Sequence, residues 1–257
     1  MKLAFYKYQG TGNDFIIVDN RTKIFPKNSL SVITKLCDRN FGIGADGLIL
    51  IENHTSTDFR MLYFNADGSE TMCGNGGRCA VAFAKKLNII DSKTTFTAYD
   101  GEHYAEIENG IVSLHMIDVT DVQLNANYVF ANTGTQHHVE LVEDLDNFPV
   151  FETGKSIRYN LYGEPGSNVN FVQQVNENTF KVRTYEKGVE DETLACGTGV
   201  TAVAIAMHAT NKTNNTLINL PVLGGDLQVS FDEKDGKYTN IFLKGAATCV
   251  FKGEIEL

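Results

Sequence analysis

An internal repeat is the feature that most limits how this chain of 257 residues can fold. The segment CGNGGRCAVAFA, residues 73–84, aligns without a gap with CGTGVTAVAIAM, residues 196–207, at an offset of 123 residues. A second pair, GTGN at 10–13 and NTGT at 132–135, repeats at an offset of 122. The repeat predicts two domains of roughly 120 residues, each large enough to bury a core of its own.

Hydrophobic periodicity places the repeated segments in buried helices and most of the remaining chain in strands. We expect helices at 29–40, 74–88 and 197–210. We expect strands at 3–8, 15–19, 48–51, 59–64, two or three within 94–117, and at 128–131, 137–142, 168–175, 180–185, 216–222, 226–231, 239–244 and 247–255. Many strands and one central helix in each half indicate the α+β class, with a curled sheet around each helix.

Composition excludes several classes of protein. The hydrophobic share of 42% and the charged share of 21% are ordinary for a globular protein. A net charge of −10 argues against a nucleic-acid partner, because phosphate contacts need a basic face. No apolar run is long enough to span a bilayer, and the start of the chain lacks the features of a signal peptide. We therefore expect a cytoplasmic protein with no membrane partner.

The cysteines give no disulfide or metal framework. In a reducing compartment we expect thiols, and no pair has zinc-like spacing, so no metal site is predicted. Three cysteines have no counterpart in the repeat and are expected to be structural: Cys37, Cys79 and Cys249. The letters GIGADG at 42–47 match a dinucleotide fingerprint, but a helix precedes them and an apolar strand follows, so a Rossmann site is not expected.

Cys73 and Cys196 stand at the starts of the two buried helices. Backbone N–H groups at a helix start lack intrahelical partners, and the helix dipole also favours an anion there. The same environment favours a thiolate. Each segment therefore offers a base together with carboxylate donors, at Gly74 and Asn75 on one side and at Gly197 and Thr198 on the other. This combination suits abstraction of a proton alpha to a carboxylate.

A lone cysteine at a helix start is more often a small buried hydrophobe. A Cys73–Cys196 disulfide is a further alternative, which we interpret as an oxidation product. Repetition of C-G-x-G in both halves favours the acid–base interpretation over both.

Taken together, the motifs resemble those of the diaminopimelate epimerase family. They occur in the family's order over nearly the whole chain: GTGNDF at 10–15, FGIGADG at 41–47, FNADGS at 64–69, CGNGGRC at 73–79, NVNF at 168–171, YEKG at 185–188 and ETLACGTG at 192–199.

The resemblance implies two pseudo-symmetric domains, each a curled, barrel-like β-sheet wrapped around a central helix. It places the N-terminal half at 1–116 plus 247–257 and the C-terminal half at 117–246, with the active site in the cleft between them. It implies a cofactor-independent isomerase, usually a homodimer, that needs neither pyridoxal phosphate nor a metal and acts on a small amino-acid substrate. Cys73 and Cys196 are its implied acid–base pair. The other implied site residues are Asn13, Asn65, Asn168 and Glu186 as substrate contacts, and His137 together with Glu186 in supporting roles.

The chain departs from the family pattern at two positions. Lys187 stands where Arg is common, and Lys is a point charge without the planar fork of Arg. Thr135 and Gln136 precede His137, where the family tends to have Asn or Ser and then Pro. Both departures concern the distal end of the substrate, where we still expect Lys187 to bind and Thr135 to support. For the three asparagines taken singly, turn formation is an alternative to binding.

The first hypothesis is therefore interconversion of LL- and meso-2,6-diaminopimelate, a step of lysine and peptidoglycan biosynthesis. Another amino-acid racemase with two cysteines, for histidine or a hydroxyproline, is the alternative within this chemistry. A thiol redox protein is the alternative outside it.

Overall fold

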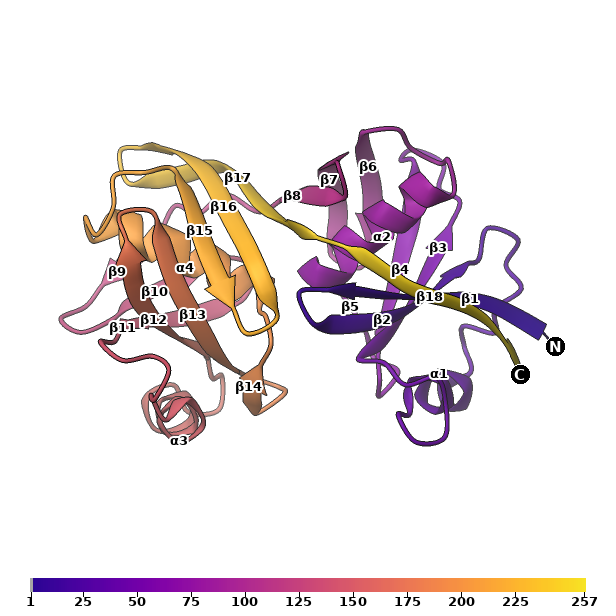
Figure 1. Ribbon diagram of the computed structural model, residues 1–257, viewed down its shortest axis with the longest axis horizontal. Coiled ribbons are helices and arrows are strands. Elements are labelled where there is room, and N and C mark those ends of the chain that lie inside the picture. Colours follow the sequence, from indigo (N-terminus) through magenta and orange to yellow (C-terminus); the bar gives the residue numbers. More distant parts are fainter. Residues whose placement is uncertain (1) are drawn as a thin grey trace. The chain divides into compact units, whose positions relative to one another are not determined.

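The computed structural model describes residues 2–257, which form two compact units. The first unit comprises the chain up to Leu114 together with Gly245–Leu257, and the second is His115–Lys244. Each is rich in strands and has one buried central helix, so the expected α+β class with curled sheets is confirmed (Figure 1).

The elements of the first unit include two helices. They are β1 (Lys2–Gly10), β2 (Asn13–Asp19), α1 (Leu30–Cys37), β3 (Gly47–Glu52), β4 (Phe59–Asn65), β5 (Glu70–Thr71), α2 (Gly74–Lys86), β6 (Lys93–Ala98), β7 (Gly101–Glu108), β8 (Ile111–His115) and β18 (Thr248–Glu256). The elements of the second unit follow a similar order. They are β9 (Val122–Leu124), β10 (Val129–Asn132), β11 (Gln136–Leu141), α3 (Val150–Ser156), the π-helical turn η1 (Ile157–Leu161), β12 (Asn168–Asn176), β13 (Thr179–Glu186), β14 (Asp191–Thr193), α4 (Gly197–Ala209), β15 (Leu217–Val222), β16 (Gly225–Lys234) and β17 (Lys237–Ala246).

Strand pairing repeats the same topology in the two units. In the first, the strands neighbour one another in the order β18-β1-β2-β3-β4-β6-β7-β8, with β2–β3 and β4–β6 parallel and the other pairs antiparallel. In the second, the order is β9-β10-β11-β12-β13-β15-β16, with β11–β12 and β13–β15 parallel. Parallel neighbours need a crossover connection, and helices supply it: α1 and α2 in one unit, α3 and α4 in the other. The duplication seen in the sequence is therefore a duplication of topology.

The central helices α2 and α4 are small-residue helices buried on nearly all sides. Val200–Met207 of α4 are all buried, and α4 contacts β10, β11, β12, β13, β15 and β16. Helix α2 contacts β1, β2, β3, β4 and β7 in the same way. A helix that is apolar all round must be covered on every side, so each sheet curls around its helix.

Helix α1 ends at Cys37, three residues earlier than the sequence predicts. The loop that follows folds back, and the N–H groups of Ile43 and Gly44 both donate to the Leu36 carbonyl, each at 3.0 Å. Gly42 has no room for a Cβ, which would lie 1.9 Å from the Lys35 carbonyl oxygen. Gly42 and Gly44 thus close the end of this helix.

Five elements were not predicted: α3, η1, and strands β5, β9 and β14. These strands have two or three residues, too short to show periodicity. Position 154 in α3 is a glycine because a Cβ there would come within 2.4 Å of Tyr185 Cβ. A glycine inside a segment argues against a helix, so α3 was not expected from the sequence. Among residues 2–257, no helix is both long and apolar enough to cross a membrane.

Candidate active site

Cys73 is the N-cap residue of α2, the central helix of the first unit. Its backbone is extended, its carbonyl accepts the Gly77 N–H at 2.8 Å, and its Sγ accepts the Gly76 N–H at 3.5 Å. The first N–H groups of a helix have no intrahelical acceptors, so they and the helix dipole favour negative charge at this point. The predicted donors Gly74 and Asn75 are the first two residues of the helix.

Asn13, the first residue of β2, lies beside Cys73. Its Oδ1 accepts from Cys73 Sγ at 3.5 Å and from Asn75 Nδ2 at 3.4 Å, while its Nδ2 donates to the Asp46 carboxylate. Arg39 holds that carboxylate in turn, with 2.7 Å between Nη2 and Asp46 Oδ1. Because a carboxylate can only accept, it fixes the amide of Asn13 with its oxygen toward the thiol. The structure therefore brings together three predicted residues: Asn13, Cys73 and Asn75.

Arg78 is a buried residue of the same helix to which the sequence analysis assigned no role. Its side chain is fully buried, and its guanidinium donates to Asn75 Oδ1 at 3.0 Å and to Thr11 Oγ1 at 2.5 Å. Within the described chain its Nε has no hydrogen-bond partner and no carboxylate pairs with it. Burial lowers the pKa of Arg78, yet a guanidinium remains charged, so a positive charge stands behind the start of α2. In the sequence, the only indication of this role was a single Arg among the small residues of the predicted buried helix.

Asn65 is the last residue of β4, and its side chain serves the turn that follows. Its Nδ2 donates to Ser69 Oγ at 2.9 Å and to Thr71 Oγ1 at 3.3 Å, and its backbone N–H donates to the Ser69 carbonyl at 2.9 Å. These three bonds hold Asn65 within its own turn, and none of them reaches Cys73.

Cys196 is the N-cap residue of α4 and repeats the position of Cys73. Its backbone is extended, its side chain is 6% exposed, and its Sγ lies 3.5 Å from Thr198 Oγ1. Gly199 has no room for a side chain, because a Cβ would lie 2.5 Å from Asn170 Oδ1 and 3.3 Å from Cys196 Sγ. Thr133 ties the loop before β11 to this helix by donating to the Thr198 carbonyl at 2.8 Å.

His137 connects to Cys196 through hydroxyl groups. Its Nε2 lies 2.9 Å from both Thr135 Oγ1 and Thr198 Oγ1, and these two oxygens are 3.1 Å apart. The ring is fully buried, and burial lowers the pKa of His137 to about 3. The imidazole is therefore neutral near pH 7. The four predicted residues Thr135, His137, Cys196 and Thr198 form one group.

Asn168 extends this group toward the end of β13. Its Nδ2 donates to Thr135 Oγ1 at 3.3 Å, and its Oδ1 accepts the backbone N–H of Lys187 at 2.8 Å. The Lys187 side chain is exposed and its Nζ donates to the Pro165 carbonyl at 3.0 Å. Glu186, the last residue of β13, is half-buried and pairs with Asp191 of β14.

Asn170 is a second residue that the sequence analysis did not single out. It lies two positions after Asn168 on β12, so both side chains share one face of the strand. The side chain is fully buried, with Nδ2 3.1 Å from His137 Nδ1 and 2.9 Å from the His138 carbonyl oxygen. Its Oδ1 accepts from Thr184 Oγ1 at 2.9 Å. In the sequence NVNF the two asparagines are two positions apart, and this spacing on a strand could have indicated that Asn170 lies on the same face as Asn168.

The three cysteines without a repeat partner differ from Cys73 and Cys196 in their surroundings. Burial raises the pKa of Cys79 to about 12 and that of Cys37 to about 11, so both stay protonated at neutral pH. Cys249 is exposed on β18. The expectation that these three are structural stays a prediction.

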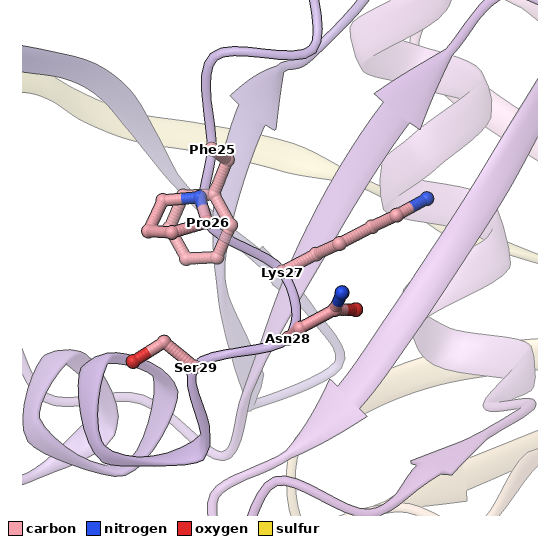
Figure 2. A pocket seen from close by; sticks show the side chains of 5 residues that line it. All are labelled: Phe25, Pro26, Lys27, Asn28 and Ser29. Carbon is pink, nitrogen blue, oxygen red and sulfur yellow. The ribbon is translucent and has the colours of Figure 1, made fainter.

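A surface hollow of about 550 Å³ lies elsewhere in the first unit, lined by the five consecutive residues 25–29. Figure 2 shows the Lys27 and Asn28 side chains pointing one way and Ser29 the other. Lys27 Nζ lies 3.4 Å from the buried carboxylate of Glu52, which also accepts from Asn20 Nδ2 at 2.7 Å. The hollow contains none of the predicted site residues, so the cysteine-centred group of each unit remains a candidate for function.

Comparison with known proteins identifies similar sequences over nearly the whole chain. A family model described as diaminopimelate epimerase matches residues 5–116 and 129–250. The diaminopimelate epimerase of Flavobacterium psychrophilum is 62% identical over 256 residues, covering 98% of this chain and 100% of that protein. That of Chlorobaculum tepidum is 42% identical, covering 96% of this chain and 99% of that protein.

Solved structures share the fold at much lower sequence identity. A phenazine biosynthesis protein of the PhzF family from Bacillus anthracis has a TM-score of 0.79 at 16% identity, covering both chains completely. A hydroxyproline epimerase from Agrobacterium vitis, with bound trans-4-hydroxy-L-proline, has a TM-score of 0.70 at 12% identity, covering 100% of this chain and 93% of that one. At these identities the likeness concerns the fold alone.

Proposed function

Because the chain belongs to the diaminopimelate epimerase family, we propose that it interconverts LL- and meso-2,6-diaminopimelate, with Cys73 and Cys196 as the acid–base pair. The observation that carries the proposal is the repeated placement of a cysteine at the N-cap of a buried helix in each unit. Each thiol has its own set of hydrogen-bonding side chains, and these sets contain most of the residues that the family motifs indicate.

In the proposed reaction one cysteine begins as thiolate and the other as thiol. The thiolate takes the proton from the alpha carbon, so that the C–H bond breaks, an S–H bond forms and the electron pair stays on the substrate as a carbanion. The second thiol gives its proton to the opposite face of the same carbon, which inverts the centre and leaves that sulfur as thiolate. The reverse reaction exchanges the two roles.

The substrate's alpha carboxylate is proposed to bind the backbone N–H groups of Gly74 and Asn75 and of Gly197 and Thr198. These are the first residues of α2 and α4, where N–H groups lack intrahelical partners. Donors that neutralise the carboxylate lower the energy of the carbanion-like transition state, since negative charge spreads onto it as the proton leaves. The buried charge of Arg78 acts in the same direction.

The remaining predicted residues are assigned to the rest of the substrate and to support. Asn13, Asn65 and Asn168 contribute amide groups, and Glu186 contributes a carboxylate. Lys187 binds the distal carboxylate after leaving the Pro165 carbonyl, or while sharing its three N–H donors with it. Thr135 and His137 support Cys196 through Thr198, as the distances of 2.9–3.1 Å among them allow.

The proposal includes the cellular setting that the family resemblance suggests. The enzyme acts as a cytoplasmic homodimer on a small amino-acid substrate, without pyridoxal phosphate, a metal or a nucleic-acid partner. Among the described residues there is no cluster of three or more side chains suited to hold a metal ion.

The test is a stereochemical assay of purified protein with LL-diaminopimelate and no added cofactor, with histidine, lysine, glutamate and trans-4-hydroxy-L-proline run in parallel. We expect meso-diaminopimelate to form and activity to survive dialysis against a chelator. A clear preference for one of the other amino acids would replace diaminopimelate by another substrate. A disulfide that cycles without racemisation of any of them would favour the redox alternative.

A further inference from the structure

A connected group of polar side chains extends from the buried interior of the second unit to Cys196. It consists of Thr184, Asn170, His137, Thr135 and Thr198, which we call the His137 network. Asn170 and His137 are fully buried, and Thr184 is 3% exposed. Thr198 is half-buried and Thr135 is exposed. At the buried end each polar hydrogen needs an acceptor within the protein, because an unsatisfied buried polar atom costs the desolvation that a hydrogen bond would otherwise offset.

The amide of Asn170 has one allowed orientation. Its Nδ2 lies 2.9 Å from the His138 carbonyl oxygen, which can only accept, and its Oδ1 lies 2.9 Å from the Thr184 hydroxyl, which can donate. Exchanging the amide's oxygen and nitrogen would bring two carbonyl oxygens together. The second N–H of Asn170 then points to His137 Nδ1 at 3.1 Å.

This donor decides which nitrogen of His137 carries the proton. Nδ1 must accept from Asn170, so in a neutral ring the proton sits on Nε2. Nε2–H in turn donates to the hydroxyl oxygens of Thr135 and Thr198, each 2.9 Å away. Neither hydroxyl can give its own hydrogen to Nε2 in this arrangement.

The hydrogens of the Thr135 and Thr198 hydroxyls are therefore not taken up by His137 Nε2 and can point toward Cys196. Asn168 Nδ2 donates to Thr135 Oγ1 at 3.3 Å, and Thr135 can donate to Thr198 Oγ1 at 3.1 Å. Thr198 then has its hydrogen left for Cys196 Sγ at 3.5 Å. With the proton on Nδ1, Nε2 would become an acceptor, and a Thr198 hydroxyl that donated to it would have no hydrogen left for Cys196.

We propose that Asn170 is a positioning residue: it fixes His137 as the Nε2–H tautomer, so that the Thr198 hydroxyl donates to Cys196 and stabilises its thiolate. A charge-assisted hydrogen bond to the anion favours the thiolate over the thiol. The inference rests on the proposed role of Cys196 as an acid–base residue, but the state of the ring and of the thiol can be measured without turnover.

The first test is ¹⁵N NMR of protein labelled at histidine, with the His137 signals assigned by their loss in His137→Gln. We expect the wild-type ring to carry its proton on Nε2, and Asn170→Leu to lose this preference. Val172→Ala is the matched control, because Val172 is a fully buried residue of the same strand that pairs with Leu141 and Val182 rather than with His137. It should lower stability and leave the tautomer unchanged. A wild-type ring protonated on Nδ1 would overturn the proposal, whether or not the Leu variant folds.

The second test is the rate at which iodoacetamide alkylates Cys196, followed on its peptide by mass spectrometry across pH. Asn170→Leu and Thr198→Val should each slow alkylation near neutral pH by about ten-fold, which corresponds to one unit in the thiol pKa. Together they should slow it no more than Thr198→Val alone, because Asn170 acts through that hydroxyl. Multiplicative effects, or an unchanged rate in Asn170→Leu, would refute the relay. If both tests give the expected results but the protein does not epimerise diaminopimelate, the proposed function is wrong and the role of Asn170 stands.

Discussion

Replacing the second glycine of each C-G-x-G segment by alanine should change stability in opposite directions in the two units. Gly76 and Gly199 occupy equivalent third positions in α2 and α4, so the gain in helix propensity is the same, about 1 kcal/mol. Their surroundings differ. A Cβ at Gly76 would meet the ends of Ile49 and Met61, both at 3.3 Å, which can move by a few tenths of an ångström, and Cys73 Cβ at 3.5 Å, an ordinary van der Waals contact. A Cβ at Gly199 would lie 2.5 Å from Asn170 Oδ1, in a group that cannot move without losing its bonds.

The balance at Gly199 is therefore unfavourable. Overpacking costs about 1–3 kcal/mol, and displacing Asn170 leaves buried partners unsatisfied at about 1–3 kcal/mol. After the helix-propensity gain the net loss is about 3 kcal/mol, which corresponds to a fall in Tm of roughly 10 °C. Gly76→Ala should be neutral or stabilising by up to about 1 kcal/mol. Urea titration and calorimetry of the two variants measure both values. Equal effects of the two substitutions, or a Gly199→Ala variant as stable as wild type, would refute this account of the close contact at Asn170.

The remaining predictions concern substrate affinity and pH. Lys187→Arg should lower the KM for diaminopimelate, by up to about ten-fold if the planar guanidinium of Arg gains one charge-assisted hydrogen bond to the distal carboxylate. Steady-state kinetics measures the KM. An unchanged or raised KM would remove Lys187 from the distal site. Burial lowers the pKa of His137 to about 3 and that of His138 to about 4. Between the unfolded value near 6.5 and these folded values the unfolded state binds more protons, so stability should fall as pH falls, by at most about 1.4 kcal/mol per pH unit for each ring. The His137→Gln and His138→Gln variants should each flatten that part of the curve of unfolding free energy against pH, and a slope unchanged in both would contradict the assignment.

The sequence predicted the parts of the fold that depend on repeated or periodic patterns. Both central helices begin where the C-G-x-G segments predict, since an apolar helix with small residues is visible in the chain itself. The order of strand neighbours was not predicted; the structure shows that each unit repeats the same crossovers. Helix α3 was missed because Gly154, which Tyr185 requires for close packing, is a residue that argues against a helix.

The roles of Arg78 and Asn170 could not be read from the sequence for a different reason. Arg78 acts on Thr11, which lies 67 positions away, and Asn170 acts on His137, 33 positions away. Such contacts depend on which strands are neighbours and on their register, and neither is visible in the sequence of a single chain. The cysteines were found because the repeat placed them at helix starts, where the chemistry is local.

In the proposed mechanism two thiols act on opposite faces of one carbon, and proton exchange in deuterated water can show whether they do. LL-diaminopimelate is incubated with the enzyme, and the substrate and product are separated at low conversion and analysed by mass spectrometry. The account predicts one deuterium at the inverted alpha carbon of the meso product and almost none in the recovered substrate, because the proton delivered comes from the second thiol. It also predicts that Cys73→Ala and Cys196→Ala each lower the rate by about 10²–10⁴-fold. Hydrogen retained at the inverted carbon, equal label in substrate and product, or full activity in either variant would contradict it.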